Sequence, residues 1–321
     1  MSTNNVVTDA EGVELTSEAS LTDRRKFLKG AGLVFGAGAA AALATPAMAA
    51  FATPAMAAPS VTNYPSANAT SYNSVLDKVL ATKEISFGVD LTFAPLQYKK
   101  PNGTPTGYII DLANSLAASL GATPKWVEIP FGDLFAGQAA GKFDMAGIAA
   151  TIKPERAQKV LFASAPAFVE SNVVILKPGY KISSLSSLNS SKVTIAVVLG
   201  SSQESAAALL YPKAKLKRLS NQAALADVSA GRSNAMIVGE FSVTDAIKTN
   251  KKLTVFKGKP VFVDENSFFM PAGDFAMKAY VDTWLRYETS HNTLAGLWNK
   301  YVGNDARKLG LQSVSITSAW S

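Results

Sequence analysis

Few side chains in this chain could do covalent or metal chemistry. Its 321 residues include no Cys and a single His, His291. The absence of Cys excludes disulfides, thiolate nucleophiles, zinc–thiolate sites and iron–sulfur clusters, and we expect no lipid anchor through cysteine. A single His cannot form a His-rich metal site, although it remains the one candidate for a His-dependent triad. We therefore expect no metal, no cofactor and no catalytic residue, with His291 a helix-cap or surface residue.

Other polar residues have types and positions suited to binding. Arg156 carries a guanidinium group, which can hold a carboxylate through two parallel hydrogen bonds. Read alone, an Arg after Lys-Pro-Glu is more often a solvated residue at a helix start. Ser201, Ser202 and Gln203 stand between a predicted strand and a predicted helix. Backbone N–H groups at such a helix start favour an anion, while a Ser there also caps the helix, and both can hold together.

Alternating strand-like and helix-like segments must position these residues. Hydrophobic patterning predicts strands at 85–89, 126–129, 143–149, 193–199, 216–219, 235–238 and 253–256. It predicts helices at 111–120, 134–140, 204–210, 222–230, 241–248, 275–287 and 294–301. This alternation is typical of an α/β protein. Beyond the N-terminal segment we find no internal repeat and no transmembrane span.

The first 57 residues have the order of an export signal. Paired arginines at 24 and 25 precede Phe-Leu-Lys, a weakly apolar run at 31–44, and two small-x-small sites ending near Ala49 and Ala57. The apolar run is shorter than the roughly 20 residues of a membrane-spanning helix. The pattern resembles a twin-arginine signal. We expect cleavage near Ala49 or Ala57, a lead-in at 58–81, and a periplasmic mature protein.

The positive charge of the chain does not come from this leader. Removing residues 1–57 takes away four basic and five acidic residues, so the net charge rises from +7 to +8. Basic residues cluster at Lys213, Lys215, Lys217 and Arg218, with few acids or aromatics between them. We expect a solvated basic face there and no nucleic-acid partner.

Five blocks of sequence, in order, resemble a known family. The first block comprises 87–96, Asn102-Gly103, Gly107-Tyr108 and 111–113. The other four are 141–157, 200–204, 231–237 and 292–300. Together they are similar to family 3 of the extracellular solute-binding proteins, the polar amino-acid receptors of ABC importers, over residues 82–304. The resemblance implies a two-lobe α/β fold, the periplasmic binding protein type II fold, with the ligand in the cleft between the lobes.

The resemblance also implies how the lobes are built and used. Lobe 1 would comprise 82–171 and 268–321, and lobe 2 would comprise 172–267. The lobes would close around an amino acid or related small carboxylate by a hinge motion, and the closed form would dock on a permease of the inner membrane. We expect a monomer.

Site residues are carried over from the family position by position. Arg156 matches the carboxylate-binding arginine. Thr151 would point its hydroxyl into the cleft, although a Thr at a strand end can instead bond to its own chain. Two residues before Thr151 the family usually contacts the ligand through a hydroxyl or the backbone; this chain has Ala149 there, so only its backbone could make that contact. The residues Ser201, Ser202 and Gln203 would contact the ligand. Asp90 would contact it as well, while Phe93 and Phe131 match aromatic or apolar walls of the cleft. Asp90, Phe93 and Phe131 could each instead have a purely structural role, and a Phe is more often part of the core.

One position departs from the family pattern. After the predicted strand at 235–238 the family generally has an Asp that accepts the ligand's α-ammonium group, whereas this chain has Gly239 followed by Glu240. Glu240 is therefore a candidate acceptor, although a Glu at a helix start also has a purely structural role. The alternative is a carboxylate ligand that lacks the amine.

A second function stays open on the same fold. Residues 279–285 are also similar to periplasmic cyclohexadienyl dehydratases, which act on prephenate or arogenate. Those enzymes need a carboxylate acid about three residues after the Gly239 position, where this chain has Ser242. The receptor is therefore the favoured reading.

Overall fold

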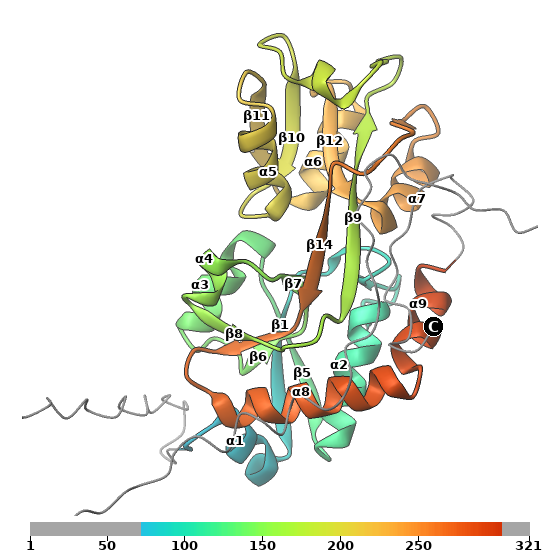
Figure 1. The fold of residues 1–321 in the computed structure, drawn as a ribbon. Helices are drawn as coiled ribbons and strands as arrows, with labels where there is room; N and C mark the ends of the chain where they lie inside the picture. Colours follow the sequence, from blue (N-terminus) through green and yellow to red (C-terminus); the bar gives the residue numbers. More distant parts are fainter. Residues whose placement is uncertain (1–71, 304–321) are drawn as a thin grey trace, which may run out of the picture. The chain divides into compact units, whose positions relative to one another are not determined.

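The structure is a computed structural model, and it describes residues 72–303 (Figure 1). The expected export signal, most of the lead-in and the last 18 residues of the expected lobe 1 lie outside this range. Among the described residues, none of the helices combines the length and the apolar character needed to cross a bilayer.

The first group of elements, lobe 1, is built on a parallel sheet in the order β5-β1-β6. It holds α1 (Val75–Thr82), β1 (Glu84–Val89), β2 (Thr92–Phe93), β3 (Gln97–Lys99), β4 (Pro105–Thr106), α2 (Tyr108–Ser119), β5 (Thr123–Glu128), η2 (Phe131–Asp133), α3 (Leu134–Ala139), β6 (Met145–Ala146), β7 (Ala150–Thr151), α4 (Pro154–Ala157) and β8 (Val160–Phe162). The chain returns to it as β15 (Phe269–Pro271), α8 (Phe275–Ser290) and α9 (Thr293–Tyr301).

The second group, lobe 2, lies between two long strands in the sequence. It holds η3 (Leu185–Leu188), β10 (Thr194–Val198), α5 (Ser202–Leu210), β11 (Lys215–Leu219), α6 (Asn221–Ser229), β12 (Ala235–Gly239), α7 (Glu240–Thr249) and β13 (Thr254–Val255). Its central strand β10 pairs in parallel with β11 and β12. The order of strands and helices confirms the α/β alternation predicted from the sequence.

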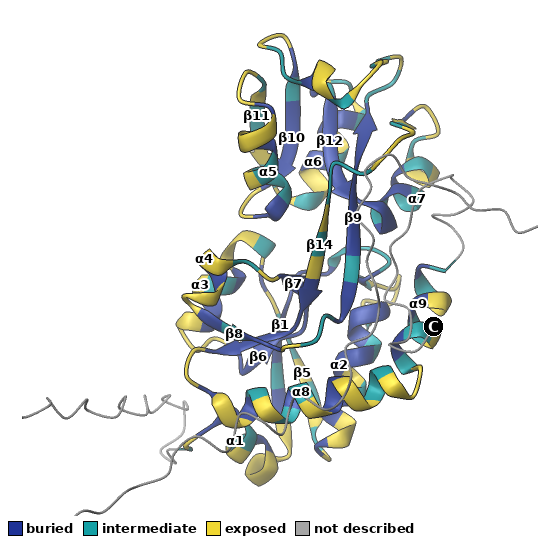
Figure 2. Cartoon of the chain, viewed as in Figure 1, coloured by how far each residue is buried: buried dark blue, intermediate teal, exposed yellow. Residues whose placement is uncertain are grey.

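Two crossing strands join the lobes, β9 (Phe168–Leu176) and β14 (Phe262–Ser267). They pair with each other in antiparallel register; β9 also pairs with β12 in lobe 2, and β14 pairs with β7 in lobe 1. The sheet order β11-β10-β12-β9-β14-β7 therefore continues from one lobe into the other (Figure 1). β9 is buried along almost its whole length (Figure 2).

The apolar cores follow the same division. Two buried clusters draw almost wholly on residues 75–168 and 268–302, with Phe241 as the exception. The other two draw their buried members from residues 173–253. Each lobe thus has a core of its own, which is the condition for two bodies to move about a hinge.

Two local expectations differ from the structure. The expected lead-in extends to residue 81, yet α1 begins at Val75 and packs Val75 and Val79 into the core of lobe 1. Asp274 fixes this helix, because its Oδ2 accepts a hydrogen bond of 2.6 Å from the Val75 N–H. The strand expected over 143–149 pairs in the sheet only at Met145 and Ala146, although the segment around it is buried.

Candidate functional site

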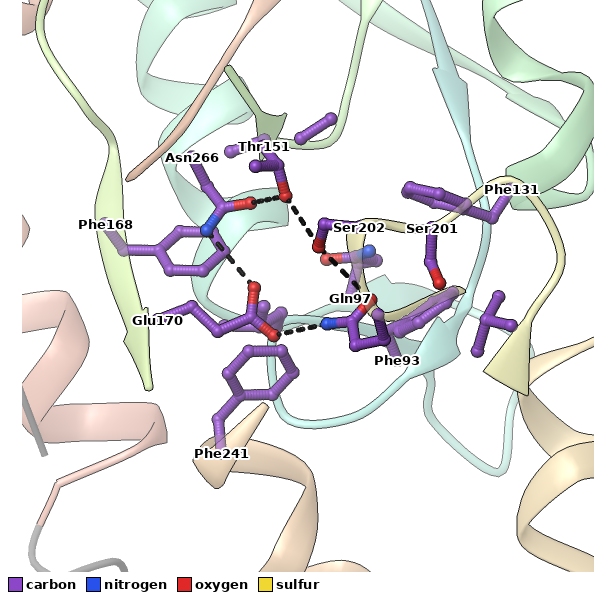
Figure 3. A pocket seen from close by; sticks show the side chains of 15 residues that line it. Phe93, Gln97, Phe131, Thr151, Phe168, Glu170, Ser201, Ser202, Phe241 and Asn266 are labelled. Atoms are coloured by element: carbon purple, nitrogen blue, oxygen red, sulfur yellow. Dashed lines mark hydrogen bonds between the residues drawn. The ribbon is translucent and has the colours of Figure 1, made fainter. Parts of the chain in front are cut away.

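A pocket lies where the two crossing strands pass between the lobes (Figure 3). Lobe 1, lobe 2 and both crossing strands contribute to its wall. The residues lining it are Phe93, Leu96, Gln97, Phe131, Ala149, Ala150, Thr151, Phe168, Glu170, Val198, Ser201, Ser202, Gln203, Phe241 and Asn266. Seven of the ten residues expected from the sequence are among them, namely Phe93, Phe131, Ala149, Thr151, Ser201, Ser202 and Gln203.

The polar side of the pocket is a chain of side-chain contacts. Thr151 Oγ1 lies 3.2 Å from Ser202 Oγ, and at the same distance from an oxygen of Asp264 and of Asn266. A hydroxyl has one proton, so Thr151 can donate to one of these partners at a time and can redirect it to a ligand. The Thr151–Ser202 contact also joins lobe 1 to lobe 2 across the pocket (Figure 3).

Serine residues begin α5 in two different ways. Ser201 Oγ accepts a hydrogen bond of 3.1 Å from the Glu204 N–H, and Glu204 Oε2 accepts one of 2.8 Å from the Gly200 N–H. These reciprocal bonds form a capping arrangement at the helix start. Ser201 thus takes the capping role that the sequence also allows, while Ser202 Oγ accepts a hydrogen bond from Thr151 Oγ1.

Arg156 is buried beside the pocket but does not line it. Its two terminal nitrogens donate hydrogen bonds of 2.9 Å to the carbonyl oxygens of Thr151 and Gly200, so it bridges the lobes. The guanidinium carbon lies 4.8 Å from the ring centre of Phe135 and 5.5 Å from that of Phe131. Burial lowers the pKa of Arg156 to about 10, which leaves it cationic at neutral pH.

Asp90 and Glu240 stand apart from the central pocket as well. The Asp90 carboxylate accepts hydrogen bonds from Thr92 and from the Phe131 N–H, at 2.9 Å for the latter, and so it orients the loop carrying that ring. Glu240 is fully buried at the start of α7 and lines a neighbouring pocket with Tyr98 and Tyr301. Neither residue reaches the lining of the pocket in Figure 3.

Glu170 is a pocket residue that sequence reasoning missed. It lies on β9 and is 5% exposed. Its two carboxyl oxygens accept hydrogen bonds from Gln203 Nε2 at 3.1 Å and from Asn266 Nδ2 at 3.2 Å. Burial, followed by the nearby acids Glu240 and Asp264, raises the pKa of this carboxyl well above its usual range. The available signal was a polar triplet, Glu-Ser-Asn, inside an otherwise apolar run.

Aromatic rings form the apolar side of the pocket. The rings of Phe93 and Phe131 lie 5.8 Å apart between centres, and Phe168 and Phe241 meet edge to face at 5.9 Å. The pocket therefore joins polar groups suited to a small charged molecule to an apolar wall. Within residues 72–303, His, Asp and Glu side chains form no group of three that could hold a metal ion.

Residues 85–304 match the family described as bacterial extracellular solute-binding proteins, family 3. A probable amino-acid ABC transporter periplasmic-binding protein of Sinorhizobium fredii is 27% identical over 50% of this chain, and the match spans about half of that relative (55%). The cyclohexadienyl dehydratase of Pseudomonas aeruginosa is 25% identical over 68% of this chain and 83% of its own length.

A solved structure agrees with these relatives. The crystal structure of an ancestral amino acid-binding protein, a precursor of cyclohexadienyl dehydratase, has a TM-score of 0.66 and 30% identity. It covers 71% of this chain and 100% of that one. The two-lobe α/β fold expected from the sequence resemblance, the periplasmic binding protein type II fold, is thereby confirmed.

Proposed function

The chain belongs to family 3 of the bacterial extracellular solute-binding proteins, and we propose that it captures an amino acid or related small carboxylate for an ABC importer. The observation that carries this proposal is the pocket at the crossing strands, whose wall combines residues of both lobes. A ligand held there contacts both bodies at once, so its binding energy favours the closed arrangement. A membrane permease would then receive the closed form.

Two groups on one side of the pocket suit the ligand's carboxylate. Arg156 uses two of its five N–H donors on backbone carbonyls, which leaves three for a ligand oxygen. The start of α5 adds the Ser202 hydroxyl and the positive end of the helix dipole. Thr151 links these groups through its contact with Ser202. We assign the ligand's carboxylate to this corner, bounded by Arg156, Thr151 and Ser202.

The localisation and oligomeric state that we propose rest on the family and on the N-terminal residues 1–57. We propose that residues 1–57 are a twin-arginine export signal and that the mature protein works as a monomer in the periplasm. Fusion of residues 1–57 to a reporter tests the signal, since replacement of both arginines by lysine should abolish export. Light scattering on the mature protein tests the monomer, and a stable dimer would contradict it.

A ligand panel tests the receptor function. At about 100 times its Kd, a ligand adds about 2.7 kcal/mol to the free energy of unfolding. In a domain of this size that raises Tm by about 5–10 °C. We expect at least one of the twenty L-amino acids to produce such a shift in the mature protein. If none of the twenty shifts Tm, the protein is no amino-acid receptor.

One observation favours a dehydratase as the second candidate. Glu170 is a buried carboxyl group in the pocket with a raised pKa, the state of a general acid. Dehydration of prephenate or arogenate requires an acid at the departing hydroxyl, and the Ser242 position supplies none. Incubation of purified protein with each compound, followed by product analysis, decides the matter. Turnover abolished by Glu170→Gln would establish the enzyme, and intact substrate would support the receptor.

A further inference from the structure

Gly239 leaves a space that another residue fills. It ends β12, directly before α7, with φ −64° and ψ 143°, a conformation open to any residue. A Cβ atom built at Gly239 would lie 2.2 Å from Glu170 Oε1 and 2.4 Å from the Phe241 ring. Steric room beside Glu170, rather than backbone freedom, is therefore what the glycine provides.

Strand register explains how Glu170 comes to this place. In the antiparallel pair of β9 and β12, Gly239 stands opposite Asn172. Side chains two residues apart on a strand share one face, so Glu170 projects on the face of Asn172 and lies next along it. The carboxylate that enters beside position 239 therefore comes from the crossing strand β9, and not from the end of β12.

The charges around Glu170 leave room for a cation. Burial is the main cause of the raised pKa of Glu170. The charges of Glu240 in α7 and Asp264 in β14 raise that pKa further, and the charge of Arg156 in α4 lowers it. Like charges near a buried carboxylate disfavour its ionised form, and a ligand cation bound to Glu170 would offset that effect.

A second acceptor in the same wall has no hydrogen-bond donor among the described residues. Gln97 is 4% exposed and lines the pocket. Its side-chain oxygen Oε1 is buried and receives no hydrogen bond from any residue in the range 72–303. A buried carbonyl without a donor costs free energy, so the oxygen would gain from an N–H group brought by a ligand. This observation is independent of the acidic residues.

We propose that Glu170 binds the ammonium group of the ligand, with Gln97 Oε1 as a second acceptor, and that Gly239 is small in order to admit the Glu170 carboxylate. The inference rests on the proposed receptor function and specifies its ligand as an ammonium-bearing carboxylate. It makes Glu170 the residue that distinguishes an amino acid from the same carboxylate without the amine. The departure at Gly239 then marks a relocated acceptor, and the amine of the ligand is retained.

The test compares each amino acid with its deamino analogue, which carries hydrogen in place of the α-ammonium group. The probes are those L-amino acids among the twenty that stabilise the wild type; for L-glutamine, as one instance, the analogue is glutaramate. Calorimetry gives Kd for both members of a pair in wild type, Glu170→Gln and Gly239→Ala. Glu265→Gln is the matched control, because it removes an exposed carboxylate from the other crossing strand.

We expect the wild type to prefer the amino acid, and Glu170→Gln to reduce that preference by roughly 10- to 100-fold. Gly239→Ala should reduce it too, since the new Cβ displaces the carboxylate, and Glu265→Gln should keep the wild-type ratio. Circular dichroism checks that each variant is folded, and either variant alone suffices for the test if the other fails to fold.

Three results would overturn the inference. They are an unchanged preference in folded Glu170→Gln, an unchanged preference in folded Gly239→Ala, and a wild type that binds both members of a pair equally. In each case the probes still bind, so the result would refute the role of Glu170 and leave the proposed receptor function intact. Failure of all twenty amino acids to stabilise the wild type counts instead against the receptor function itself.

Discussion

Replacement of Arg156 by Ala separates recognition of a carboxylate from closure of the lobes. Arg156 is 7% exposed, and the two hydrogen bonds of its guanidinium group have different consequences. The bond to the Thr151 carbonyl stays within lobe 1, whereas the bond to the Gly200 carbonyl crosses to lobe 2. Loss of the first weakens lobe 1 in every state, and loss of the second weakens only the closed state.

The magnitude follows from burial and charge. Removing one partner of a buried charge pair costs about 2–5 kcal/mol, so a carboxylate ligand should bind roughly 30- to 4,000-fold more weakly. The lobe-bridging bond to Gly200 accounts for about 1.5–3 kcal/mol of closure energy, because its donor is charged. That part of the loss applies to any ligand, whether or not it carries a carboxylate.

The assay therefore uses a pair of ligands. Calorimetry measures Kd for the amino acid that stabilises the wild type most and for its carboxamide, in which the carboxylate is neutral. Arg156→Ala should weaken the acid by more than tenfold beyond its effect on the amide. Lys153→Ala is the control, since Lys153 Nζ donates a lobe-bridging hydrogen bond of 2.9 Å to Ser205 Oγ away from the pocket lining. Equal losses for acid and amide in Arg156→Ala would refute carboxylate recognition by Arg156.

Three further outcomes are expected. Because the pKa of Glu170 is raised in the free protein, an ammonium ligand must displace the proton of this carboxyl group. The affinity for an amino acid should therefore rise with pH up to that pKa and level off above it. Calorimetry of Glu170→Gln should show no such rise. Burial raises the pKa of Asp227, but hydrogen bonds from Lys217, Ser233 and Arg232 outweigh it and lower that pKa to about 2. The variant Asp227→Asn should therefore lose about 2 kcal/mol in urea unfolding at pH 7. That difference should shrink as pH falls from about 4 toward 2, and a constant difference would contradict the pairing. His291→Ala should keep wild-type ligand affinity in calorimetry, since the ring is exposed; complete loss in a folded variant would refute that.

Helices and strands with one buried face were predictable from the sequence, because their apolar residues recur at regular intervals. The strand found at Glu84–Val89 and the helix at Tyr108–Ser119 agree with their predictions to within a few residues. α1 was missed because it follows a Ser- and Asn-rich stretch. The signal present there was a capping residue, Ser74, whose Oγ accepts a hydrogen bond from the Asp77 N–H.

The crossing strands were not read from periodicity, because their polar residues face a pocket and each other. A strand that carries Glu170, Ser171 and Asn172 in succession lacks the alternation typical of a half-buried strand. Their place came from the family resemblance alone. The same reason hid Glu170, since only the tertiary structure brings it to Gly239 from the neighbouring strand.

Where the chain turns at strand ends, as at Thr151 and Ser202, the residues expected from the sequence line the pocket. It was less informative for long side chains, whose direction depends on their neighbours. Arg156 reaches backbone carbonyls, and Asp90 orients a loop, so both lie beside the pocket rather than in its lining. Their roles toward a ligand stay predictions.

A crystal structure of the mature protein with the most stabilising L-amino acid would test the central claim most directly. We predict one intact molecule in the pocket between the crossing strands, with its carboxylate on Arg156, Thr151 or Ser202 and its ammonium group on Glu170. A ligand bound elsewhere, or in the pocket with its ammonium group away from Glu170, would contradict the account.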